Sequence, residues 1–89
     1  MDRDAIRETW QKVKQMGCVA FRTHTQPWPA AHYDVADELG ILMVIEGAVW
    51  NDDDTYRIFD PKFWDNYAAH LTSMVAQHKN RPSVVMWIV

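Results

Sequence analysis

These 89 residues have few features that would assign the chain to one cellular compartment or to a membrane. There is one cysteine, Cys18, so an intrachain disulfide is excluded. No charged segment followed by an apolar stretch precedes it, and we therefore expect a cytoplasmic location by default. No apolar run reaches the roughly 18 residues that a membrane-spanning helix needs.

Positive charge is also scarce. The chain has 9 Lys and Arg against 12 Asp and Glu, which gives a net charge of -3 and a pI of about 5.7. A basic surface is what attracts nucleic acid or an anionic membrane, and this balance offers none. We therefore expect neither nucleic acid nor a membrane as a partner.

Apolar and aromatic residues, in contrast, are plentiful. The chain is 48% hydrophobic and 24% charged, which is typical of a globular protein. Its length fits one small domain or a piece of a larger one. Five tryptophans are many for this length, and their area must be buried on a large core or displayed at a site.

The first part of the chain predicts a helix, a glycine and a strand. Asp2 or Asp4 can cap the helix, and Gly17 stands where a helix ends in a left-handed residue. Residues 18–23 then form a run that is apolar on both faces until Arg22, which predicts a buried strand. The helical stripe consists of apolar residues three or four apart: Ile6, Trp10, Val13 and Met16.

The same order of helix and strand recurs twice. Pro29 suits the first turn of a helix that ends at Gly40, and an apolar run follows over residues 41–46. Asp60 and the proline after it form a cap and first position for a third helix, which ends before residues 80–82. The third apolar run covers residues 84–89.

Strands that are apolar on both faces and alternate with helices are typical of parallel sheets with helical crossovers. We therefore predict an α/β fold with three parallel strands alternating with three helices (αβαβαβ). Side chains alternate along a strand, so Arg22 and Glu46 should point to the same side at the carboxyl ends of neighbouring strands. Parallel α/β folds bind their ligands at this edge.

Two blocks of sequence carry several residue types at fixed spacing. They are DELGILMVIE at residues 37–46 and NRPSVVMW at residues 80–87. Together with VAFRT at residues 19–23, they resemble the catalytic barrel of glycoside hydrolase family two, which includes β-galactosidases, β-glucuronidases and β-mannosidases. The resemblance covers nearly the whole chain from about Ile6. It implies that residues 1–89 are a single incomplete segment of a (β/α)8 TIM barrel, covering about strands two to four.

The resemblance also implies what the chain lacks for the family's reaction. Retaining glycosidases need two carboxyl groups roughly 5–5.5 Å apart, one as acid/base and one as nucleophile. In the family, the acid/base Glu follows the residue equivalent to Trp87 within a Gly-Asn-Glu segment, and the nucleophile lies nearer the end of the barrel. The sequence stops at Val89. We therefore expect a piece of a glycoside hydrolase that does not hydrolyse glycosides alone.

A few residues are candidates for contact with a sugar. Guanidinium and carboxylate groups suit paired contacts with hydroxyls, and an aromatic face can stack on a pyranose ring. The family often has Ser-His-Tyr-Pro after the first of these strands, whereas His24 stands one position earlier here. We expect no metal or cofactor. The candidates are Arg22, His24, Trp28, Glu46 and Trp50.

Structural roles are open to the same residues. Arg22 and Glu46 can form a mutual ion pair, because a charge at a strand end needs a partner. Trp28 and Trp50 lie in loops after strands and can pack those loops onto the barrel. The family often has Asp-Glu where this chain has Ile45-Glu46, so only the Glu matches.

Other polar and aromatic residues are better explained by structure than by chemistry. The acidic residues 52–54 lack the glycine and glutamate of a calcium loop, which favours a solvated loop. Cys18 has no basic neighbour and starts an apolar run, which favours an inert core thiol. Trp10 and Trp64 fall on helical apolar stripes, and Trp87 is an interior strand residue, which favours a place in the core for all three. No Cys or carboxylate stands at zinc-ligand spacing from the remaining histidines, His32, His70 and His78.

A three-stranded piece of a barrel has open sheet edges and an uncovered face, so we expect a homo-oligomer or another association through those edges. Two alternatives to a hydrolase segment stay open: a non-catalytic carbohydrate-binding module and a purely structural fragment that self-associates. The parent's sugar also stays open, because the resemblance extends to enzymes that act on several sugars.

Overall fold

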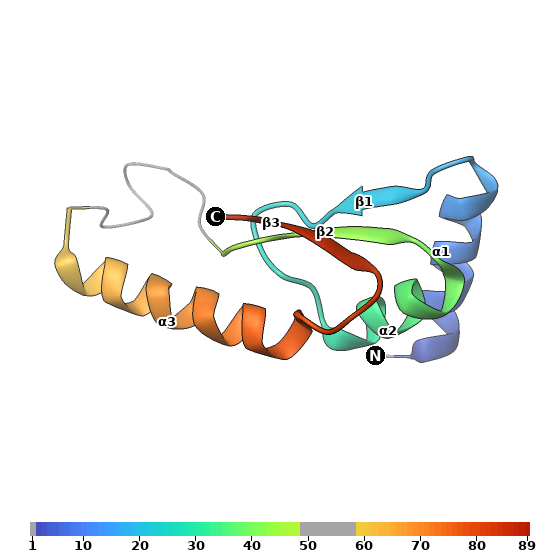
Figure 1. Cartoon of the computed structure of the whole chain (residues 1–89). Helices are drawn as coiled ribbons and strands as arrows, with labels where there is room; N and C mark the ends of the chain where they lie inside the picture. Colours follow the sequence, from blue (N-terminus) through green and yellow to red (C-terminus); the bar gives the residue numbers. More distant parts are fainter. Residues whose placement is uncertain (1, 49–58) are drawn as a thin grey trace.

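A computed structural model describes residues 2–48 and 59–89. Helices and strands alternate along the chain (Figure 1), and the predicted order is confirmed. The elements are α1 (Arg3–Gln15), β1 (Ala20–Arg22), α2 (Ala30–Leu39), β2 (Leu42–Glu46), α3 (Pro61–His78) and β3 (Val84–Ile88).

The helix ends follow the local sequence. Asp2 and Asp60 precede α1 and α3, and each side chain accepts a hydrogen bond of 2.9 Å from the backbone N–H two residues later. These bonds satisfy N–H groups that have no partner inside the helix. After α1 and α2, Gly17 and Gly40 have φ angles of 88° and 75°. This left-handed conformation is easily reached by glycine and lets the chain turn from helix to strand.

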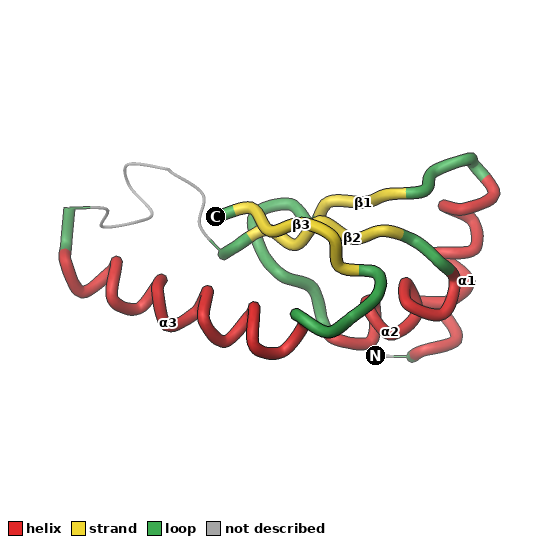
Figure 2. Tube along the Cα trace, viewed as in Figure 1, coloured by secondary structure: helices red, strands yellow, loops and turns green. Residues whose placement is uncertain are grey.

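The three strands form one parallel sheet in the order β1-β2-β3. Arg22 pairs with Val44, and Val44 pairs with Met86 on the other side. The register shifts between Met43 and Val44, so that β3 has one extra residue, Val85, at this point. All three helices lie on one side of the sheet (Figure 2). Right-handed crossovers require this of α2 and α3, which each connect two neighbouring parallel strands.

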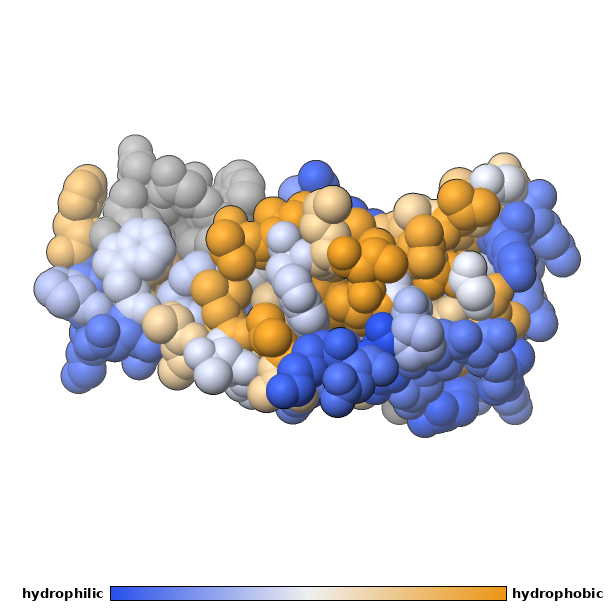
Figure 3. All heavy atoms as spheres, in the orientation of Figure 1, coloured by the Kyte–Doolittle hydropathy of each residue, from blue (hydrophilic) through white to orange (hydrophobic). Residues whose placement is uncertain are grey.

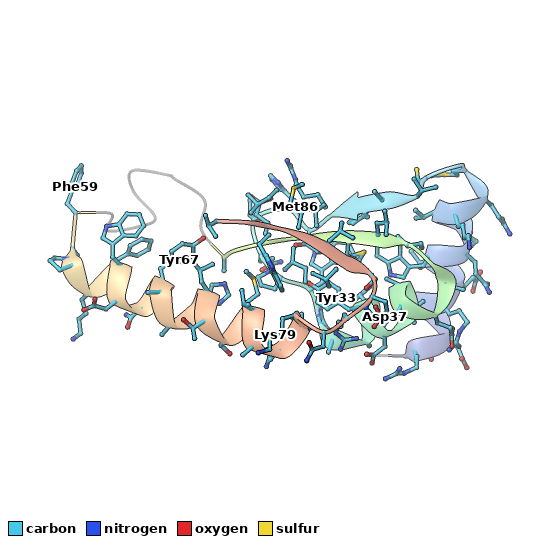
Figure 4. The ribbon with its side chains drawn as sticks, viewed as in Figure 1. Tyr33, Asp37, Phe59, Tyr67, Lys79 and Met86 are labelled. Atoms are coloured by element: carbon cyan, nitrogen blue, oxygen red, sulfur yellow. The ribbon has the colours of Figure 1, made fainter. Side chains whose placement is uncertain are left out.

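The two faces of the sheet differ because the helices cover only one of them. Met43 and Ile45 point into the covered face and are fully buried. Leu42 and Met86 point to the other face and are 41% and 57% exposed. Figure 3 shows apolar side chains along the strands, and Figure 4 shows Met86 pointing away from the helices. The core on the covered face consists of Ile6, Trp10, Tyr33, Val35, Ala36, Ile41, Met43, Ile45 and Met74.

Several predictions of burial are wrong. Met16 and Val19 are 74% and 67% exposed, so the apolar stripe of α1 is not buried to its end and the run at residues 18–23 is not a buried strand. Cys18 is exposed rather than a core thiol, since it precedes β1 and lies where no helix covers the chain. Trp64 is 49% exposed because the first turns of α3 run past the end of the sheet (Figure 1). Trp10 is buried as predicted, and Trp87 packs against the core. The acidic residues 52–54 lie outside the described residues.

The chain is elongated for its length. Its radius of gyration is 14.7 Å and its extents are 44 × 26 × 23 Å, whereas a compact domain of this length would have a radius of about 12 Å. The open face and the overhanging part of α3 account for the difference. In residues 2–48 and 59–89, no helix is both long and apolar enough to span a membrane.

Candidate functional site

The carboxyl ends of β1 and β2 bring Arg22 and Glu46 together, as the alternation of side chains predicts. The Nε atom of Arg22 lies 3.3 Å from Oε2 of Glu46. The Arg22 side chain is 56% exposed and that of Glu46 is 17% exposed. The pair therefore lies at the open face of the sheet, with the arginine toward solvent and the carboxylate partly enclosed.

The carboxylate of Glu46 is incompletely satisfied. Its Oε2 atom is buried and forms no hydrogen bond, so the approach of Arg22 is a contact between charges without hydrogen-bond geometry. A carboxylate oxygen has room for two acceptor interactions. A buried one without hydrogen bonds is costly, which is why such atoms are rare unless a ligand or water completes them. Glu46 can thus accept a further hydrogen bond.

Hydrogen bonds between neighbouring segments fix the position of this edge. Thr23 is fully buried directly after β1, and its hydroxyl accepts a bond of 3.0 Å from the Glu46 N–H. The same hydroxyl hydrogen-bonds to Tyr33, whose own oxygen accepts a 2.7 Å bond from the Trp28 N–H. Burial raises the pKa of Tyr33 and keeps the phenol neutral. The loop after β1 is therefore tied to α2 and to the end of β2.

Tyr67 brings a second unsatisfied oxygen near the end of β2. Figure 4 shows its side chain pointing from α3 toward the strand ends. Its hydroxyl is buried without a hydrogen bond, and its pKa is raised by burial and, secondarily, by the charge of Glu46. A Cβ on Gly47 would clash with this hydroxyl and lie 2.9 Å from Leu71 Cδ2, so a larger residue there would displace the ends of these two side chains.

His24 joins Arg22 at the edge, whereas Trp28 does not. The Nδ1 atom of His24 is 3.4 Å from Arg22 Nη2, and the imidazole is exposed. Trp50 lies outside the described residues. The structure therefore brings together three of the five predicted residues: Arg22, His24 and Glu46.

Trp28 lies on the covered side of the sheet. Its ring centroid is 5.9 Å from that of Trp10 and 5.1 Å from that of Phe21. His32 lies 4.9 Å away, at an interplanar angle of 66°. Phe21 precedes Arg22 in β1 and points to the opposite face. The sheet thus separates Trp28 from Arg22 and Glu46.

The amino end of β3 holds a second group of charges, which we call the Arg81 cluster: Asp34, Asp37, His78, Arg81 and Ser83. Nη1 of Arg81 donates to Asp34 at 2.6 Å and to Asp37 at 3.0 Å. Its Nε donates to His78 Nδ1 at 2.9 Å, and Ser83 N–H donates to Asp37 at 3.0 Å. The cluster connects α2 with the turn between α3 and β3.

Charges in the Arg81 cluster shift each other's titration. Hydrogen bonding to Arg81 lowers the pKa of Asp34 below its ordinary value of 3.8. Burial, followed by the charge of Arg81, lowers the pKa of His78 below 6.5. An accepting Nδ1 also requires neutral imidazole. The cluster is therefore arranged around an ionised Asp34 and a neutral His78.

The blocks at residues 37–46 and 80–87 meet in this cluster, through Asp37, Arg81 and Ser83. Their fixed spacing is thus explained by a contact at the amino end of the sheet, away from the Arg22 edge. Interactions at the amino end of barrel strands serve stability, whereas ligands bind at the carboxyl end. Within the described part of the chain, no three His, Cys, Asp or Glu side chains are grouped closely enough to hold a metal ion.

Comparison with known proteins gives one consistent match. The family model described as glycosyl hydrolases family 2, TIM barrel domain, matches residues 1–89. A β-galactosidase of Alteromonas mediterranea is 30% identical over 98% of this chain and 9% of its own length, and a β-glucuronidase of Streptococcus agalactiae is 32% identical over 86% and 15%.

A solved structure agrees with the sequence matches. β-Glucuronidase 2 of Bacteroides uniformis superposes with a TM-score of 0.76 at 27% identity, covering 98% of this chain and 10% of that one. The chain therefore spans about a tenth of the length of these relatives. Its three parallel strands and three helices are part of a TIM barrel, as predicted, and the chain belongs to the glycosyl hydrolase family 2 TIM barrel domain family.

Proposed function

We propose that Arg22, His24 and Glu46 bind hydroxyl groups of a β-glycoside at the carboxyl edge of this barrel segment. The observation that carries the proposal is the buried Glu46 Oε2, which lies 3.3 Å from Arg22 and has no hydrogen bond. A sugar hydroxyl can donate to that oxygen and accept from the exposed guanidinium or imidazole. The contact with Arg22 leaves acceptor positions on the Glu46 carboxylate open.

We further propose that the chain alone does not hydrolyse glycosides. The retaining reaction needs two carboxyl groups roughly 5–5.5 Å apart across the scissile bond. In the described residues, Glu46 is the single carboxylate at the ends of the three strands. One carboxylate can orient or protonate a sugar, but it cannot both protonate the leaving group and form the covalent intermediate.

Calorimetric titration of the purified chain tests the binding role. The relatives named above are a β-galactosidase and two β-glucuronidases, so methyl β-galactoside and methyl β-glucuronide are suitable probes, with methyl β-mannoside as the third. We expect weak binding of at least one probe and a loss of roughly tenfold or more in Arg22→Ala and Glu46→Gln, since each removes charge-assisted hydrogen bonds. Equal binding in the wild type and both variants, or no binding by the wild type, would contradict this role.

Release of 4-nitrophenol from the corresponding 4-nitrophenyl β-glycosides tests the second proposal. We expect no release above that of buffer. The matched control is Glu46→Gln, prepared in the same way. Turnover that is present in the wild-type chain and abolished by Glu46→Gln would show that this segment is catalytically competent. Equal turnover in both would identify a contaminating enzyme.

A second candidate role is self-association, with a homo-oligomer as the product. It is supported by the open face, where Leu42 and Met86 are exposed, and by Val89 at its end. In the described residues, β1 and β3 each pair with one strand only, which leaves a free edge on both sides. Light scattering after size exclusion should show dimers or larger species at micromolar concentration, and Met86→Lys should shift them toward monomer. A monodisperse wild-type monomer would contradict this role.

A further inference from the structure

We propose that a groove on the helix side of the sheet is a second carbohydrate site, which takes a neutral sugar ring and is independent of the Arg22 edge. The groove lies between the loop after β1 and one face of α3 and has a volume of about 460 Å³. Ligand pockets are typically about 300–1,000 Å³. The residues on which the proposal rests are Trp28, His70, Ser73, Met74, Gln77 and His78.

The groove and the Arg22 edge are on opposite sides of the sheet. Trp28, which lines the groove, packs on Phe21, and successive side chains in β1 point to opposite faces. Arg22 follows Phe21 and therefore faces away from the groove. Binding at one site thus leaves the other accessible, and this inference does not rest on the proposed function of the edge.

One wall of the groove suits the apolar face of a pyranose. Trp28 is partly buried, and its contacts with Trp10, Phe21 and His32 hold the ring in place. Pro27 and Pro29 lie in the same loop and extend this wall, and Met74 adds apolar surface from α3. The Trp28 indole is already held in place before a sugar binds. It therefore loses little side-chain freedom on binding, and stacking a sugar ring on it costs little entropy.

The other wall supplies neutral hydrogen-bonding groups. His70 Nε2 accepts a 3.0 Å bond from the Ala48 N–H, so the ring proton is on Nδ1 and can be donated. His78 Nδ1 accepts from Arg81, which places its ring proton on Nε2. Gln26, Ser73 and Gln77 add side chains that both donate and accept.

Charge determines which sugars the groove should prefer. Among the residues that the structure describes, the lining contains no Asp, Glu, Lys or Arg, and burial keeps His78 neutral by lowering its pKa. A uronate would lose hydration of its carboxylate without gaining an ionic partner. A neutral polyhydroxylated ring matches both the aromatic wall and the uncharged donors and acceptors.

The test is a titration of the full chain with methyl β-glucoside, followed by NMR, with glucuronate as the charged comparison. We expect methyl β-glucoside to shift the Trp28 indole N–H and the backbone amides of residues 70–78, and glucuronate to leave them unshifted. Ser73→Trp should fill the groove from an exposed position on α3 and weaken binding by at least about tenfold.

Two further variants keep the test decisive. Gln77→Ala removes only a neutral hydrogen-bonding group from an exposed position, so it should fold and weaken binding even if Ser73→Trp does not fold. Arg22→Ala should leave the groove shifts unchanged. Loss of those shifts in Arg22→Ala would mean that the sugar binds at the edge, and absence of shifts in the wild type would overturn the groove. If the wild-type chain shows the groove shifts but no sugar binding at the Arg22 edge, only the proposed function is contradicted.

Discussion

Both ends of the sheet place an arginine against carboxylates, but only one end completes the interaction. Arg81 donates hydrogen bonds to Asp34 and Asp37 at 2.6 and 3.0 Å, and its side chain is 19% exposed. Arg22 approaches Glu46 at 3.3 Å without hydrogen-bond geometry, and its side chain is 56% exposed. The completed pair stabilises the fold, whereas the incomplete pair has donors and acceptors left for a ligand.

The difference follows from what each arginine connects. Arg81 joins segments 44 to 47 residues apart, so its bonds hold α2 against the turn before β3. Charge-assisted hydrogen bonds are strong when solvent is largely excluded. Arg22 and Glu46 stand on two strands that the sheet already pairs, so their contact adds little to the fold.

The largest expected effect is the loss of stability in Arg81→Ala. Its removal leaves Asp37 partly buried without this cation and Asp34 with only the exposed Arg3, which should lower the free energy of unfolding by about 2–4 kcal/mol. Urea unfolding followed by tryptophan fluorescence measures it. Arg3→Ala is the matched control, because Arg3 also pairs with Asp34, at 3.1 Å, but is 56% exposed. The control should lose less than about 1 kcal/mol, and equal losses would remove the distinction between the two ends.

A smaller effect is expected from pH. The pKa values of His78 and Asp34 are both lowered in the folded chain, so the unfolded chain binds more protons and stability falls as pH falls. The His78 contribution is lost from about pH 6.5 downward, and that of Asp34 below about pH 4. The midpoints of urea unfolding, measured from pH 8 to pH 5, follow the loss of the His78 contribution.

A His78 variant separates this step from other titrations. His32, whose pKa is also lowered by burial, contributes with the same sign. His78→Phe keeps a ring beside Tyr33 but cannot titrate, so its midpoints should fall less between pH 7 and pH 5 than those of the wild type. Arg22→Ala should keep the wild-type slope. A flat wild-type profile in this interval would contradict the burial of neutral His78.

Local sequence was sufficient for the order of elements but not for their burial. Asp60, Gly17 and Gly40 mark helix ends through bonds and φ angles within a few residues, and these are readable without the fold. Burial depends on what covers an element. Cys18 lies in an apolar run and Trp64 on an apolar stripe, yet Cys18 is exposed and Trp64 is 49% exposed.

The candidate site shows the same division. Alternation along parallel strands was enough to place Arg22 beside Glu46. The contacts of Arg81 with Asp34 and Asp37 cross more than 40 residues and have no periodic signal, so the sequence showed the two blocks but not that they touch. The position of Trp28 behind the sheet depends on how the loop after β1 folds back, which its prolines restrict but do not determine.

The smallest expected effect tests the incomplete end directly. Arg22→Ala removes one exposed partner of a charge contact, so the free energy of unfolding should fall by less than about 1 kcal/mol. Glu46→Gln should be similarly mild, because it also removes the unsatisfied carboxylate charge. Both variants are measured by the same urea titration as Arg81→Ala. A loss in Arg22→Ala as large as that in Arg81→Ala would mean that the carboxyl edge holds the sheet together, and its spare hydrogen-bonding capacity would then be no evidence for a ligand.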